Sequence, residues 1–281
     1  MTTQEINRNS PIGVFDSGIG GLTVFAAIAK TMPAESLVYL GDTARVPYGT
    51  RSPKTVEIYS RRVASHLWEE GIKALVVACN TASTYALEAL SSAGKIAGIP
   101  VIGVIEPGVA EAIKATKSGV VGVLGTEGTV LGGRYQSLLE ASGVDVEALA
   151  CPLFVSLAEE GWTKGPIAEM VAQRYLSNFT TNPDTVILGC THYPMLKETI
   201  QTVLPRVTLI DSAEATARAL AIRLKNSALL TTQGGIGDRR FIVTDNKDRF
   251  LRNGASFLGA PPEPAVVVDI GEQSGIFAEI K

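Results

Sequence analysis

The chain has 281 residues, of which 46% are hydrophobic and 19% are charged, and its formal net charge is −3. This length suits two domains, and the apolar content excludes a disordered or fibrous chain; without a basic excess, nucleic acid is not expected as a partner. No apolar run reaches the roughly 18 residues that cross a bilayer, and the polar N-terminus lacks a signal-peptide core. We therefore expect a cytoplasmic protein that binds no membrane.

In chain order, short runs rich in β-branched residues alternate with amphipathic stretches. This alternation predicts the α/β class, with doubly wound parallel sheets that carry helices on both faces. The predicted strands are residues 12–15, 37–40, 74–78, 101–104, 120–124, 144–150, 185–188, 207–210, 241–243 and 265–268.

Helical stretches follow most of these strands. Ser52 and Pro53 form a helix start, because the hydroxyl can cap the helix and proline suits its first position. Apolar residues then recur at helical spacing over 56–67. Further helices are expected at 214–224 and, in the last part of the chain, around 248–251.

Two pairs of segments repeat at nearly one offset. The sequence GVFDSG at 13–18 resembles GVLGTE at 122–127, and VVACNT at 76–81 resembles ILGCTH at 187–192, with offsets of 109 and 111 residues. We interpret this as two similar doubly wound parallel-sheet domains that face each other across a cleft. One domain would comprise residues 1–98 and about 206–281, with the helix from residue 213 packing back on it, and the other residues 99–205.

The cysteines do not suggest a disulfide framework or a structural zinc site. Cys79, Cys151 and Cys190 are odd in number and widely spaced, which is typical of a reducing compartment. No CxxC pair is present, and His66 and His192 are the only histidines. Cys151 is interpreted as a buried apolar residue and His66 as a structural one.

Cys79 and Cys190 each follow a predicted strand and precede a predicted helix. Ligands of open parallel sheets bind beyond the carboxyl ends of the strands, and a helix N-terminus favours a thiolate. If the two halves face each other, so do the two thiols. Such a pair could exchange disulfides, bind a metal with further ligands, or transfer protons on opposite faces of a stereocentre.

The neighbouring motifs suit an amino-acid substrate. The glycines of DSGIGG at 16–21 let backbone amides approach an anion, but they lack the GxGxxG spacing, so a nicotinamide cofactor is not expected. Asp16 is placed to orient an ammonium group or to tune a thiol, and the loop PYGT at 47–50 offers further amides and a hydroxyl. Donors suited to carboxylates flank the thiols at Asn80, Thr81, Thr191 and His192.

At this point the sequence resembles glutamate racemase, of the aspartate/glutamate racemase family, over nearly its whole length. The motifs that carry the resemblance occur in the family's order: FDSGIGG at 15–21, GDTARVPYG at 41–49, ACNTA at 78–82 and LGCTHYP at 188–194. The resemblance implies an isomerase that needs no cofactor or metal and interconverts L- and D-glutamate. It also implies a supply of D-glutamate for peptidoglycan synthesis, and hence a role in cell wall biogenesis and cell shape. A homodimer is compatible with the sequence but is not determined by it.

By the same resemblance, Cys79 and Cys190 form the acid/base pair, Asp16 assists Cys79, and His192 and Glu159 assist Cys190. Cys79 would take the proton from D-glutamate and Cys190 from L-glutamate. The glutamate-binding residues would be Asp16, Ser17, Pro47, Tyr48, Gly49, Asn80, Thr81, Thr191 and His192. One departure bears on Glu159: Ser156 stands where the family is expected to have proline, so Glu160 remains an alternative to Glu159.

Other functions remain open on the residues alone. A related racemase could act on aspartate, since two thiols do not measure side-chain length. A binding protein with two facing halves would not need both thiols, and a thiol-redox enzyme would form a Cys79–Cys190 disulfide under mild oxidation.

Overall fold

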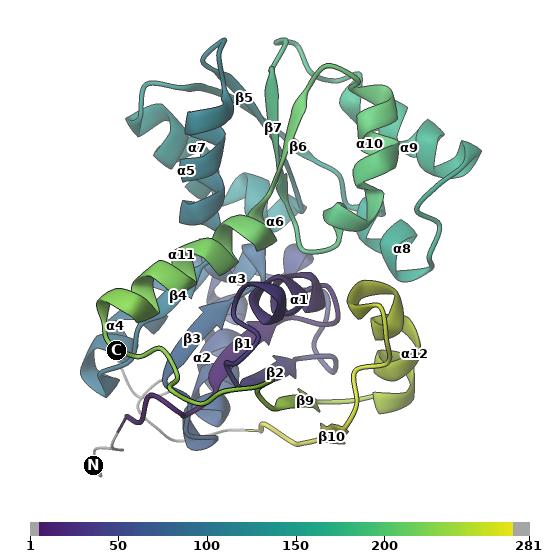
Figure 1. Cartoon of the computed structure of the whole chain (residues 1–281). Helices are drawn as coiled ribbons and strands as arrows, with labels where there is room; N and C mark the ends of the chain where they lie inside the picture. The colour runs from purple at the N-terminus through teal and green to yellow at the C-terminus, as the bar shows by residue number, and fades with distance from the viewer. Residues whose placement is uncertain (1–5, 272–281) are drawn as a thin grey trace.

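The computed structural model describes residues 6–271, which form two parallel sheets flanked by helices (Figure 1). The larger sheet has the strand order β10-β9-β2-β1-β3-β4. Its strands are β1 (Ile12–Asp16), β2 (Leu37–Gly41), β3 (Ala74–Val77), β4 (Val101–Gly103), β9 (Arg239–Val243) and β10 (Ala265–Val267). The three central strands are buried along their whole length, because helices cover both faces of the sheet.

The smaller sheet has the strand order β6-β5-β7-β8. Its strands are β5 (Val120–Gly125), β6 (Asp145–Ala150), β7 (Thr185–Gly189) and β8 (Thr208–Asp211). Every strand predicted from the β-branched runs is present, and the predicted α/β class with parallel sheets is confirmed.

The helices fill the connections between the strands. Ser52 caps its helix as expected, since its hydroxyl accepts a hydrogen bond from the Thr55 amide at 3.3 Å. The helices are α1 (Leu22–Thr31), α2 (Pro53–Glu69), α3 (Asn80–Tyr85), α4 (Leu87–Ala97), α5 (Ile105–Ala115), α6 (Glu127–Leu131), α7 (Arg134–Ala141), α8 (Leu153–Glu159), α9 (Pro166–Leu176), α10 (Lys197–Val203), α11 (Ser212–Asn226) and α12 (Lys247–Leu258), with 3₁₀ turns η1 (Tyr48–Thr50) and η2 (Tyr193–Leu196).

The chain leaves one sheet for the other at later residues than the predicted domain boundaries. Strand β4 pairs with β3 of the six-stranded sheet, although residues 99–205 were assigned to the other half. Strand β8 pairs with β7 of the four-stranded sheet, although it follows residue 205. In each case the strand that follows the proline-containing break extends the sheet that the chain has just built. The division of the chain into domains stays a prediction.

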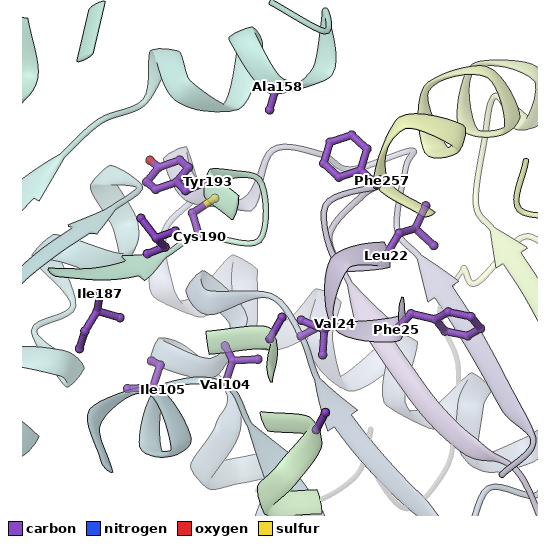
Figure 2. Packing of buried hydrophobic residues seen from close by; sticks show 14 of the residues in the cluster. Leu22, Val24, Phe25, Val104, Ile105, Ala158, Ile187, Cys190, Tyr193 and Phe257 are labelled. Atoms are coloured by element: carbon purple, nitrogen blue, oxygen red, sulfur yellow. The ribbon is translucent and has the colours of Figure 1, made fainter. Parts of the chain in front are cut away.

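Helix α11 contacts α1 of the six-stranded half and α5 of the other half, and it lies between them in Figure 1. One apolar cluster continues from α1 to the four-stranded sheet. Figure 2 shows part of it, with Leu22, Val24 and Phe25 on one side and Ile187 and Cys190 on the other. The two sheets therefore share a continuous apolar contact beside the site described next.

Candidate active site

The carboxyl ends of four strands, two from each sheet, meet at one cavity of about 150 Å³. Ser17 follows β1 and Cys79 follows β3, while Thr126 follows β5 and Cys190 follows β7. All four residues line the cavity. Two sheets with their strand ends turned toward each other thus bring two thiols to one cavity, as the repeat predicts.

Most of the residues singled out from the sequence line this cavity. Asp16 and Glu159 do not; each lies behind a lining residue. The predicted residues on the cavity wall are Cys79, Cys190, Ser17, Pro47, Tyr48, Gly49, Asn80, Thr81, Thr191 and His192. Cys151 is buried away from the wall, and its thiol donates to the Leu149 carbonyl at 3.7 Å, in agreement with a packing role.

Cys79 is the N-cap of α3. The Ala82 amide donates to its sulfur at 3.4 Å, and the thiol donates to the Ser17 hydroxyl at 3.6 Å. Burial and the negative charge of Asp16 nevertheless raise the pKa of Cys79 to about 12, because they outweigh the amide. The amide at the start of α3 thus lowers the pKa of Cys79, as expected of a helix N-terminus, but burial and Asp16 raise it by more.

Asp16 is the last residue of β1. Its Oδ2 accepts from the Gly18 amide at 2.9 Å, while Oδ1 has no hydrogen-bond partner among the described residues. Burial raises the pKa of this carboxyl, and the charge of His192 together with backbone amides opposes that rise. A free carboxyl oxygen at this depth is suited to interact with a cation or to share a proton.

Cys190 has a different environment. It precedes the 3₁₀ turn η2 rather than an α-helix, so it caps no helix, contrary to the expectation. Its sulfur lies 3.7 Å from Nδ1 of His192. Burial lowers the pKa of His192, but hydrogen bonds and charge from Cys190 and Glu159 raise it to about 10. The raised pKa favours a positive charge on His192, and this imidazole lies directly against the sulfur of Cys190.

Glu159, rather than Glu160, contacts His192. Its Oε1 lies 3.2 Å from Nε2 of the imidazole, and its Oε2 accepts from Arg249 at 3.1 Å. Burial raises the pKa of Glu159, while its bonds to His192 and the charge of Arg249 lower it overall. Glu160 is exposed. Serine at position 156 leaves α8 intact and places Glu159 at its last residue.

Two tyrosines hold polar groups near the cavity, Tyr48 from the wall itself and Tyr135 from behind it. The Tyr135 hydroxyl donates to Oδ1 of Asn80 at 2.8 Å, which turns the amide nitrogen of Asn80 away from it; that nitrogen has no hydrogen-bond partner among the described residues. The Tyr48 hydroxyl donates to Asp42 at 2.7 Å, so Tyr48 cannot also offer that proton to a ligand. No sequence signal points to Tyr135, which lies outside every motif.

Further lining residues were not predicted. Thr126 could have been found, because it follows β5 as Ser17 follows β1, and its hydroxyl lies 2.9 Å from that of Thr81 across the cavity wall. The others are Val46, Glu127, Pro152, Val155 and Ser156, while Thr50 belongs to the predicted PYGT loop. Among residues 6–271, no group of three or more His, Cys, Asp or Glu side chains could hold a metal ion. Over the same residues, no helix has the length and apolar character to span a membrane.

Comparisons with known proteins agree with this geometry. The profile of the Asp/Glu/Hydantoin racemase family matches residues 12–220. The glutamate racemase of Geobacter metallireducens is 51% identical over 252 residues, which cover 88% of this chain and 92% of that protein. That of Aquifex aeolicus is 46% identical, covering 92% and 98%. The structure of the Francisella tularensis glutamate racemase in complex with D-glutamate covers 95% of this chain and 100% of its own, at 38% identity and a TM-score of 0.88. The chain belongs to the Asp/Glu/Hydantoin racemase family and, within it, to the glutamate racemases, which are isomerases.

Proposed function

We propose that this enzyme interconverts L- and D-glutamate without a cofactor, with Cys79 and Cys190 as acid and base on opposite faces of the α-carbon. The observation that carries the proposal is that both thiols line one cavity and come from the strand ends of two different sheets. General acid and base groups each contribute about 10²–10⁴-fold to such a proton transfer. The relatives named glutamate racemase support glutamate as the substrate.

The reaction needs only proton transfers. With L-glutamate, the Cys190 thiolate takes the α-proton, and the electron pair left on the α-carbon delocalises into the α-carboxylate. The Cys79 thiol then donates its proton to the opposite face, which yields D-glutamate. The enzyme is left with a Cys79 thiolate and a Cys190 thiol, which is the state that takes the proton from D-glutamate. Proton exchange with solvent restores the first state.

The raised pKa of Cys79 suits the direction that starts from L-glutamate, in which Cys79 donates a proton. Cys79, with its pKa raised to about 12, holds a proton that it can donate. Cys190 lies beside the imidazolium of His192. The substrate ammonium group would bring a positive charge between the thiols and so lower the cost of a thiolate on Cys79 in the reverse direction.

The polar groups of the wall would hold the two carboxylates and the ammonium group of the substrate. Asn80 offers an amide nitrogen without another partner, and Ser17, Thr81 and Thr191 offer hydroxyls. The hydroxyl of Tyr48 is occupied by Asp42, so this loop would bind the substrate through its backbone. Pro47 and Gly49 would place that backbone against the substrate. Asp16, which lies behind the cavity wall, would attract the ammonium group through its negative charge.

We further propose that the two sheets belong to two domains that close over glutamate, and that the D-glutamate is used for peptidoglycan synthesis. The peptidoglycan role rests on the likeness to glutamate racemases alone. The two-domain division rests on the two sheets, each with its own helical cover.

The test is α-hydrogen exchange in deuterated solvent, followed by NMR for each glutamate enantiomer. The wild-type enzyme should place one solvent deuteron in each product molecule. Cys79→Ser should still exchange the α-hydrogen of L-glutamate without forming D-glutamate, and Cys190→Ser should do the converse. Cys151→Ser, which changes a thiol outside the cavity, is the matched control and should retain activity. Retention of the substrate α-hydrogen in the product, or full racemisation by either single variant, would contradict the proposal. Equal turnover of aspartate would overturn the substrate assignment alone.

A further inference from the structure

Helix α12 belongs to the returning C-terminal segment, yet one of its faces is turned toward the Cys190 side of the cavity. Figure 1 shows α12 beside the six-stranded sheet, below α8 of the other half. Three residues follow one another on this helix at steps of four positions: Arg249, Asn253 and Phe257. Residues with this spacing lie on one face of a helix.

Each of the three residues contacts one of the two residues behind Cys190, Glu159 or His192. Arg249 donates to Oε2 of Glu159 at 3.1 Å, and Asn253 donates to the Glu159 backbone carbonyl at 3.2 Å. The ring of Phe257 packs edge-on against the imidazole of His192, with ring centres 5.6 Å apart. One helix face thus fixes the carboxylate, the backbone beside it and the imidazole.

We propose that this face of α12 positions Glu159 and His192, and that Arg249, as a positioning residue, sets the reactivity of Cys190 through them. The inference rests on the proposed function, since it concerns one of the two proposed bases. Oε1 of Glu159 can stay on His192 because Arg249 holds Oε2, so each carboxylate oxygen has its own partner.

The effect should be confined to one thiol. His192 is surrounded by Cys190, Glu159 and Asp16, and Glu159 by His192 and Arg249. The contacts of the Cys79 sulfur come instead from Ser17 and Ala82, which are not part of α12. Cys79 therefore serves as an internal reference within the same molecule.

The experiment compares Arg249→Gln with Arg249→Lys and with Arg252→Gln. Arg252 is exposed on the same helix, so its substitution removes the same charge without touching Glu159. Alkylation of each cysteine by iodoacetamide is followed by peptide mass spectrometry from pH 6 to 9, together with kcat and KM for glutamate. Because Arg249 is half exposed, its contact is weakened by solvent, and a change of about fivefold is expected.

Arg249→Gln should lower kcat, and the rate of Cys190 alkylation at pH 7, by about fivefold. The pH dependence of Cys190 alkylation should move to higher pH, and the alkylation of Cys79 should not change. Arg249→Lys should restore most of the loss, and Arg252→Gln should behave as wild type. Equal slowing of both cysteines, or a lower kcat with unchanged Cys190 alkylation, would overturn the proposal. Failure of the two-base scheme is recognised separately, since Cys190→Ser would then still racemise glutamate.

Discussion

The surroundings of Cys79 and Cys190 differ although the two residues occupy equivalent places in a repeated unit. Each follows a buried parallel strand, but Cys79 caps α3 and lies beside a carboxyl group, while Cys190 precedes a 3₁₀ turn and lies beside an imidazolium. The neighbours of Cys79 raise its pKa, while the neighbour of Cys190 is an imidazole whose own pKa is raised. The repeated backbone therefore supplies the positions of the two thiols, and the side chains behind them supply groups of opposite charge.

The largest expected effect comes from removing the group behind Cys190. His192→Asn should lower kcat by about 10²–10³-fold, because the imidazole against the sulfur of Cys190 is lost. The matched change on the other side, Asp16→Asn, should lower kcat by about tenfold and should make the Cys79 thiol more acidic, since a negative charge beside it is removed. Steady-state circular dichroism assays in both directions measure the first effect, and the pH dependence of Cys79 alkylation the second. Similar losses of kcat in both variants, with no change in the acidity of Cys79, would show that the surroundings of Cys79 and Cys190 do not differ in this way.

A second prediction concerns stability and pH. In the folded protein the pKa of His192 is about 10, above its ordinary value of 6.5, so its charged form stabilises the fold. That contribution is complete below pH 6.5 and is lost as the pH rises toward 10. Urea unfolding at pH 6 and pH 10 should show that wild type loses roughly 4 kcal/mol more than His192→Asn over this interval. Parallel pH curves for the two proteins would show that His192 titrates near its ordinary value.

The smallest expected effect concerns substrate binding on the Cys79 side. Tyr135→Phe removes the hydroxyl that orients Asn80 and should raise KM about tenfold with a smaller change in kcat. Thermal unfolding controls for a loss of stability, since Tyr135 is fully buried. A variant with unchanged KM would mean that Asn80 is oriented without Tyr135.

Much of the fold could be read from local patterns. The β-branched runs located every strand, and Ser52 and Pro53 located the start of α2. The repeat and the family motifs located most residues of the cavity wall, because strand ends carry ligand-binding residues in parallel sheets.

Other features depended on contacts between distant segments. The only sign of α12 was a short helix at 248–251, and its meeting with Glu159 joins residues that are 90 positions apart. Thr126 faces Thr81, and Tyr135 reaches Asn80, only because the two sheets turn their strand ends toward each other.

The sequence by itself determined the succession of strands and helices along the chain, the meeting of Cys79 and Cys190 at one cavity, and the family. These follow from residue types and spacings, which act over a few positions along the chain. Only the tertiary structure decided which sheet takes β4 and β8, and which charge stands behind each thiol. Strand pairing, burial and electrostatic interaction depend on distance in space, so the folded chain alone sets the acidity of Cys79 and His192.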